Sequence, residues 1–185
     1  MATMIGKGTD VVDFLKSQHT QIKAGFERVL AAQAKERERA FTDLRRLLAV
    51  HETAEEEIVH PAARRALREG DVIVSARLRE ENEAKKALAR LEKMDVMSRD
   101  FESDFRVLQG NVIAHAEAEE REEFSALATA LEPERLERMR KAAELAESIA
   151  PTRPHAGVES ATANLLVGPF MSMVDRTRDA LSGKH

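Results

Sequence analysis

The chain has 185 residues, and 29 Lys and Arg residues against 33 Asp and Glu residues give it a formal net charge of −4. Because nucleic-acid phosphates require clustered cations, this mild acidity without a basic block argues against a nucleic-acid partner. The absence of cysteine excludes a disulfide framework, a thiol nucleophile and a cysteine-ligated metal site.

The spacing of apolar residues predicts an all-α protein. Tyr and Trp are absent, and Ala, Leu, Glu, Arg and Lys dominate the chain, which favours helices over strands. The first predicted helix covers residues 10–34, with Thr9 as a candidate N-cap. Its inward face recurs at steps of three and four and contains Leu15, His19, Ile22, Phe26 and Val29.

Three further long helices are expected at residues 40–69, 72–93 and 98–131, and Pro133 ends the last of them. Pro61 offers a point for a bend in the second. Helices of this length with short connections predict an antiparallel up-down-up-down four-helix bundle over residues 8–131. Each of these three helices has an inward face of residues at helical spacing. The face is Leu44, Leu48, His51, Glu55, Ile58 and Ala62 in the helix at 40–69; Leu78, Glu81, Ala84, Ala87, Leu88 and Leu91 in the helix at 72–93; and Phe105, Leu108, Val112, His115, Glu119 and Leu127 in the helix at 98–131.

Residues 132–185 differ in character and are expected to form a C-terminal helical extension, packed on the bundle or on a second subunit. A short, strongly charged helix is predicted at residues 134–149, followed by a linker at 150–155. A last helical segment, residues 161–181, is broken by Gly168 and Pro169. Both a monomer and a homodimer are compatible with this pattern.

The informative feature is a set of polar residues at inward positions that Leu or Ile would normally occupy. A buried carboxylate without a partner costs several kcal/mol, so three at one level of a bundle require compensation. A pair of divalent or trivalent cations would supply it. The candidate ligands are His19, His51, Glu55, Glu81, His115 and Glu119.

The spacing of these residues supports a metal site. His51 and Glu55, and likewise His115 and Glu119, form His-x3-Glu pairs that place both side chains on one helix face. One such pair on a charged helix, or a lone core histidine, would carry little meaning, but two pairs on two helices with a histidine on a third favour metal binding. Nitrogen and oxygen donors without thiolate suit iron or manganese, and zinc less exclusively.

The other histidines are not expected to be ligands. His60 belongs to a Glu-x2-His pattern known from di-iron carboxylate bundles, but no second copy follows. At 100° per residue His60 lies about 180° around the helix from His51, so we expect it either at the surface or in contact with the ligands without being one of them. His155 and His185 fall in the linker and at the C-terminus.

Three stretches together resemble the hemerythrin-like HHE cation-binding family. They are DFLKSQHTQI at residues 13–22, HETAEEEIVHP at 51–61 and HAEAEEREEF at 115–124, and the resemblance covers about residues 8–130. It implies a four-helix bundle with a non-haem di-iron centre, two iron ions carrying an oxo or hydroxo bridge. It further implies His19, His51 and His115 as terminal ligands and Glu55 and Glu119 as bridging carboxylates.

Two departures from the family pattern matter. Asn82 stands where the family's third helix has a ligand histidine, and the helical phase favours Glu81 as its replacement. Glu52, beside His51, could also reach a second metal. The family usually has Tyr at the position of His60, so any role of that tyrosine is lost or altered here.

The functional expectation is a protein that reacts with oxygen species, with catalase-like decomposition of hydrogen peroxide as the first hypothesis. The candidate ligand set has fewer histidines and more carboxylates than an oxygen-carrying hemerythrin, and carboxylates favour the more highly charged ferric ion. Redox turnover or sensing is therefore expected rather than reversible oxygen storage. The alternatives are a sensor or binding module for iron, oxygen or nitric oxide without turnover, and a structural zinc-holding bundle. No membrane span of roughly 20 apolar residues and no signal peptide is recognisable, so a cytoplasmic protein is expected.

Overall fold

The computed structural model describes residues 10–149, and all of its regular structure is helical. The elements in chain order are α1 (Val11–Ala31), α2 (Ala34–Ala54), the π-helical turn η1 (Glu55–Val59), α3 (His60–Ala66), α4 (Gly70–Leu91), α5 (Arg99–Ala118), the π-helical turn η2 (Glu119–Phe124), α6 (Ser125–Ala130) and α7 (Pro133–Ile149).

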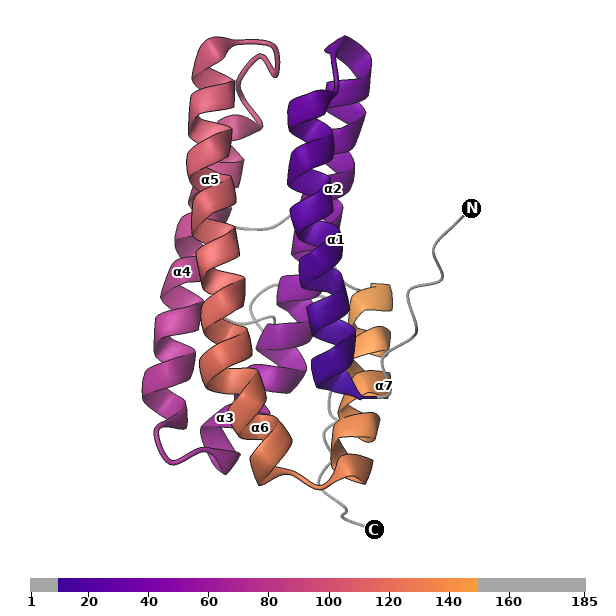
Figure 1. Ribbon diagram of the computed structural model, residues 1–185, viewed down its shortest axis with the longest axis vertical. Helices are drawn as coiled ribbons and strands as arrows, with labels where there is room; N and C mark the ends of the chain where they lie inside the picture. The colour runs from indigo at the N-terminus through magenta and orange to yellow at the C-terminus, as the bar shows by residue number, and fades with distance from the viewer. Residues whose placement is uncertain (1–9, 150–185) are drawn as a thin grey trace, which may run out of the picture.

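These elements build the antiparallel bundle that the sequence predicts (Figure 1). Its four rods are α1, then α2 continued through η1 into α3, then α4, then α5 continued through η2 into α6. Neighbouring rods run in opposite directions; α1 packs along α2, and α4 packs along α5. The predicted all-α class is confirmed, and among residues 10–149 no helix is long and apolar enough to cross a membrane.

The helix ends differ from the expected ones at the first connection. Asp10, rather than Thr9, caps α1 and accepts backbone hydrogen bonds from Val12 and Asp13 at 2.8 and 3.0 Å. Only residues 32 and 33 separate α1 from α2, which begins at Ala34 instead of residue 40. Residues 34–39 carry strong helix formers without an apolar stripe, so their propensity, not their periodicity, extends the helix.

The apolar core consists of two clusters. One contains Phe26, Phe41, Phe101 and Phe105 and lies toward the α1–α2 and α4–α5 connections. Their ring centroids lie 5.1–5.9 Å apart in stacked, tilted and edge-to-face pairs. The other includes Phe124 and side chains of η1, α3, α6 and α7. On α1, Leu15 belongs to the second cluster and Ile22 to the first, so His19 lies between them. The predicted polar level is therefore enclosed by apolar layers on both sides.

Helix α7 is the described part of the C-terminal extension. It contacts α1, α2 and η1, and it buries Leu136, Met139, Ala142 and Ala143 in the second apolar cluster. This helix packs on the bundle of its own chain. The predicted linker at residues 150–155 and the predicted segment at 161–181 lie outside the described residues.

Candidate metal centre

The six inward polar side chains meet at one level of the bundle. They form two groups, each with one possible ligand atom per residue and all such atoms within 4.8 Å of one another. Glu55 and Glu119 belong to both groups, so they occupy the position that carboxylates shared between two cations would need. The first group is His19, His51, Glu55 and Glu119; the second is Glu55, Glu81, His115 and Glu119.

The carboxylates at this level are buried without hydrogen bonds that would compensate them. Glu55 and Glu119 are fully buried, and neither oxygen of either carboxylate has a hydrogen-bond partner within the described residues. One oxygen of Glu81 and the Nε2 atom of His19 are in the same situation. Since buried polar atoms are normally paired, so many unpaired ligand atoms facing one another fit bound cations well.

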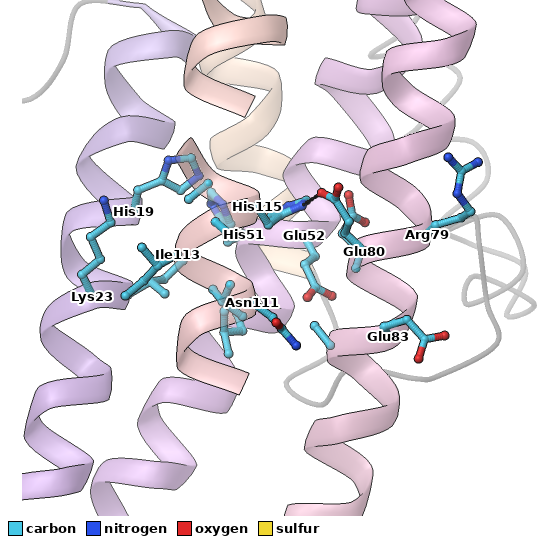
Figure 2. Close-up of a pocket in the computed structure, with 17 residues that line it drawn as sticks. His19, Lys23, His51, Glu52, Arg79, Glu80, Glu83, Asn111, Ile113 and His115 are labelled. Atoms are coloured by element: carbon cyan, nitrogen blue, oxygen red, sulfur yellow. Dashed lines mark hydrogen bonds and ion pairs between the residues drawn. The ribbon is translucent and has the colours of Figure 1, made fainter. Parts of the chain in front are cut away.

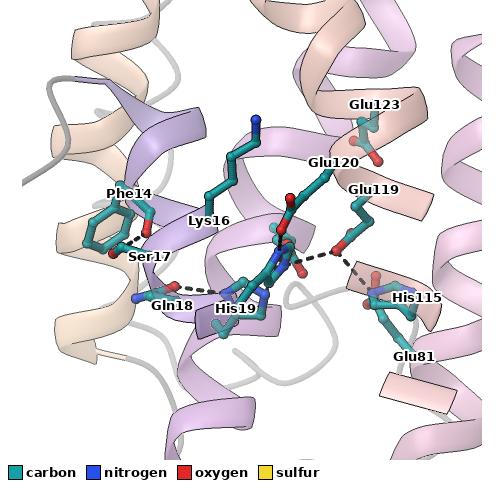
Figure 3. Close-up of polar contacts among 12 residues, drawn as sticks. Phe14, Lys16, Ser17, Gln18, His19, Glu81, His115, Glu119, Glu120 and Glu123 are labelled. Atoms are coloured by element: carbon teal, nitrogen blue, oxygen red, sulfur yellow. Dashed lines mark hydrogen bonds and ion pairs between the residues drawn. The ribbon is translucent and has the colours of Figure 1, made fainter. Parts of the chain in front are cut away.

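The three imidazoles are oriented as metal-binding histidines usually are, and Figure 3 shows two of them, His19 and His115, beside Glu119. Each Nδ1 meets a side-chain oxygen that can accept its hydrogen, which leaves Nε2 facing the shared carboxylates. Nε2 of His51 lies 3.2 Å from a carboxylate oxygen of Glu55. Glu119 lies 3.3 Å from Nε2 of His115 and 3.4 Å from Nε2 of His19. The Nδ1 contacts are His19 with Glu120 at 2.8 Å, His51 with Gln18 at 2.8 Å and His115 with Glu80 at 2.9 Å.

The pKa shifts of the side chains in this cluster also favour a bound cation. Burial and the neighbouring Glu119 carboxylate raise the pKa of Glu55 well above its usual value. Burial, together with the other histidines, lowers the pKa of His51 well below its usual value. The protein alone therefore disfavours both charged forms, and a cation would stabilise the Glu55 carboxylate while using the neutral His51.

Both shared carboxylates stand at the first residue of a π-helical turn. Glu55 begins η1 and Glu119 begins η2. In η1 the backbone N–H of His60 bonds to the carbonyl of Glu55, five residues back. Such turns are rare and occur frequently at functional sites. Because one begins at the Glu of each His-x3-Glu pair, they support a functional site at this position in the bundle.

The family model for the hemerythrin HHE cation-binding domain matches residues 10–127. The chain belongs to this family. A crystal structure of a hemerythrin HHE cation-binding domain-containing protein from Mycobacterium kansasii superposes with a TM-score of 0.67 at 18% sequence identity. The match covers 92% of this chain and 99% of that one, so the likeness in fold extends beyond the bundle. No curated protein matches the sequence.

In this HHE domain, the third helix contributes Glu81 to the cluster. Glu81 is buried on α4 and belongs to the second group, whereas Asn82 is half-buried and belongs to neither group. The inward face of α4 is otherwise unusual, since it also buries Arg77 and Lys85. Glu81 therefore meets the cluster, whereas Asn82, one residue further along the helix and at the family's usual histidine position, does not.

Glu52, the other candidate, is held by a cation of the protein. Its Oε2 lies 3.6 Å from Nζ of Lys85, which also forms an ion pair with Glu56. Burial raises the pKa of Glu52 to about 8 despite the Lys85 charge. Glu52 lies in neither ligand group, so it lines the edge of the site with its own counter-ion.

Of the two positions expected for His60, the surface is wrong, and the place beside a candidate ligand is the one that the structure has. His60 is buried, its Nε2 lies 2.8 Å from Glu81 and its Nδ1 lies 2.9 Å from Glu123. Glu123 is fully buried as well. The reason is η1: each residue of a π turn advances by less than 100°, so the phase counted from His51 no longer holds at His60.

His60 could itself join a third group of possible ligands with Glu119 and Glu123. Both of its ring nitrogens, however, already face carboxylates. Although burial opposes protonation, the Glu81 and Glu123 carboxylates raise the pKa of His60 well above its usual value. The same contact lowers the pKa of Glu81 to about 2, against the effect of burial. His60 therefore acts as a buried cation that holds Glu81 in place.

Removing this buried cation has a large expected cost. In the metal-free protein, His60→Leu should lower the free energy of unfolding by about 3–5 kcal/mol, because it strands two buried carboxylates. Glu120→Ala removes a more exposed partner of a histidine and should cost about 1 kcal/mol or less. Urea unfolding of both variants measures the difference; equal costs would show that His60 does not stabilise its carboxylates.

A cavity of about 400 Å³ adjoins the cluster (Figure 2). It is lined by all four long helices, and its polar lining includes His19, His51 and His115. Exposed residues such as Lys23 and Glu83 also line it, so it opens to solvent. Small molecules therefore have a route from the surface to the candidate ligands.

Proposed function

We propose that this HHE-domain protein holds two iron ions and decomposes hydrogen peroxide in a catalase-like reaction. The observation that carries the proposal is the pair of four-residue ligand groups sharing Glu55 and Glu119. Two cations that share two carboxylates are close enough to act on one small substrate. In the overall reaction two molecules of hydrogen peroxide give one molecule of oxygen and two of water.

The donor set supports iron. Three imidazole nitrogens and three carboxylates, without thiolate, suit iron or manganese. His19 and His51 would hold one ion, Glu81 and His115 the other, and Glu55 and Glu119 both. When bound, a pair of iron ions supplies two electrons by changing oxidation state, which matches the two-electron chemistry of peroxide.

The residues around the ligands support redox turnover in three ways. Gln18, Glu80 and Glu120 hold the imidazoles at Nδ1 and so fix their orientation. The apolar clusters above and below keep bulk water away from the shared carboxylates. The chain contains no Tyr or Trp, so it offers no phenol or indole through which an oxidising equivalent could leave the site.

The test is metal content together with peroxide turnover of the purified full chain. We expect two irons per chain by elemental analysis, near-ultraviolet absorption, and oxygen release at many equivalents of hydrogen peroxide per protein. His51→Ala should reduce turnover by about 100-fold or more, on the scale known for disturbed metal sites. Glu117→Ala alters an exposed carboxylate of α5 and should leave both readouts unchanged. A colourless protein loaded with zinc would rule out the redox function.

A second candidate function is sensing of iron, oxygen or nitric oxide without turnover. Its supporting observation is a hydrogen-bond chain from the cluster to the C-terminal helix. Nδ1 of His51 meets Oε1 of Gln18, and the Gln18 amide donates to Glu147 on α7 at 2.7 Å. A change at His51 could reach α7 by this chain. Iron binding without peroxide turnover, and with altered protease sensitivity of α7, would favour this function.

A further inference from the structure

The cavity beside the cluster is much larger than hydrogen peroxide requires. Its volume is about 400 Å³, whereas a water-sized molecule takes up about 30 Å³ in the liquid. Pockets for small organic ligands range from about 300 to 1,000 Å³. The space therefore fits a molecule with a hydrocarbon body of modest size.

The walls of the cavity suit such a body. Ile22 on α1, Leu48 on α2, Ala84 on α4 and Val112 and Ile113 on α5 present apolar side chains to it. Contact with these walls would favour an apolar group by roughly 25 cal/mol per Å² removed from water. Hydrogen peroxide has no apolar surface and gains nothing from them.

Four of the polar residues that line the cavity belong to the ligand cluster. They are His19, His51, His115 and Glu81. Nε2 of His19 is buried without a hydrogen-bond partner among residues 10–149. A ligand seated in the cavity would therefore place its oxygen-bearing end against the candidate metal ligands and its hydrocarbon end among the apolar walls.

The charges around the cavity select against a strongly charged ligand. Lys23 lies on the α1 side and Arg79 on the α4 side, and Glu80 and Glu83 stand beside Arg79 (Figure 2). Two further carboxylates, Glu52 and Glu81, line the cavity, but each has a cation of its own behind the wall. These cations are Lys85, 3.6 Å from Glu52, and His60, 2.8 Å from Glu81, so the lining as a whole produces no strong field of either sign. A neutral amphiphilic molecule fits it best.

We propose that the cavity binds neutral organic hydroperoxides, with the hydrocarbon body on the apolar walls and the peroxide group toward His19, His51 and His115. This assignment rests on the proposed function, because the redox chemistry belongs to the metal site. The overall reaction is organic hydroperoxide plus hydrogen peroxide giving the alcohol, water and oxygen. The O–O bond of the hydroperoxide breaks and takes up two electrons and two protons, which hydrogen peroxide supplies as it becomes oxygen.

The first test is binding, which does not depend on turnover. Cumyl alcohol, the product of cumene hydroperoxide, is titrated into the metal-free full chain and followed by calorimetry. Ala84→Phe fills the cavity from α4 and should weaken binding by about tenfold or more, because the ring occupies the ligand's space. Ala89→Phe changes another half-buried alanine of α4 that does not line the cavity, and it should leave binding unchanged. Ala84→Leu is the milder variant if the Phe substitution does not fold.

The second test is turnover by the iron-loaded full chain with cumene hydroperoxide and hydrogen peroxide, with cumyl alcohol and oxygen measured as products. Ala84→Phe should raise the KM for cumene hydroperoxide relative to that for hydrogen peroxide, and Ala89→Phe should change neither. Hydrogen peroxide turnover without alcohol binding or hydroperoxide reduction would overturn this inference and leave the proposed function standing. Alcohol binding without turnover of either peroxide would overturn the proposed function, and with it the hydroperoxide as ligand.

Discussion

Glu55→Ala and Glu119→Ala should each abolish the binding of both metal ions. Each of these carboxylates belongs to both ligand groups, so its removal takes an oxygen donor from both sites at once. His51 and His115 belong to one group each, and His51→Ala or His115→Ala should lose at least the ion of its own group. Elemental analysis of purified variants, as metal per chain, gives the result directly.

Glu117→Ala is the matched control, because it removes an exposed carboxylate two residues before Glu119. It should bind as much metal as the unaltered chain. Two ions retained in Glu55→Ala would show that Glu55 is not shared. A further result separates ligand loss from misfolding: in the metal-free protein Glu55→Gln should raise the melting temperature, because it removes a charge that burial and Glu119 disfavour.

Metal removal should destabilise the protein strongly near neutral pH. A ligand that binds only the folded state adds about 2.7 kcal/mol when its free concentration is 100 times its Kd, which shifts the melting temperature of a chain of this size by about 5–11 °C. Chelated protein should therefore melt well below the loaded protein in a calorimetric scan. Equal melting temperatures would contradict a buried site with several carboxylates.

The metal-free protein should recover part of this loss as the pH falls from 8 to 5. The pKa of Glu55 is raised well above its usual value and that of Glu52 is raised to about 8, so protons bind the folded state more tightly than the unfolded state. Their stabilising protonation is complete below the ordinary pKa of glutamate and is lost as the pH rises through the folded values.

Two other groups limit this recovery. The lowered pKa of His51 makes its protonation favour the unfolded state as the pH falls through the usual histidine range. The pKa of Glu81 is lowered to about 2, so its stabilising contribution is lost below the ordinary glutamate value. The melting temperature of the metal-free protein should therefore rise between pH 8 and 5 and fall below about pH 4.5. The loaded protein should show no such rise, since bound cations compete with the protons.

The sequence by itself determined the helical class and six of the side chains that meet in the polar cluster. Helical periodicity depends only on local spacing, and within each helix it correctly placed His19 between Leu15 and Ile22 and turned Glu81, not Asn82, inward. The pairing of His51 with Glu55 likewise follows from adjacent turns of one helix, before either π turn intervenes.

The surroundings of the cluster were decided only by the tertiary structure. The π turns at Glu55 and Glu119 shift the helical phase of the residues that follow them, and the spacing of apolar residues does not predict these turns. The buried contacts of His60 with Glu81 and Glu123 could therefore not be predicted from the sequence. The cavity has the same origin, because it is the volume that side chains of four separate helices leave unfilled. Local spacing specifies which face a residue occupies, whereas these features depend on how distant helices meet.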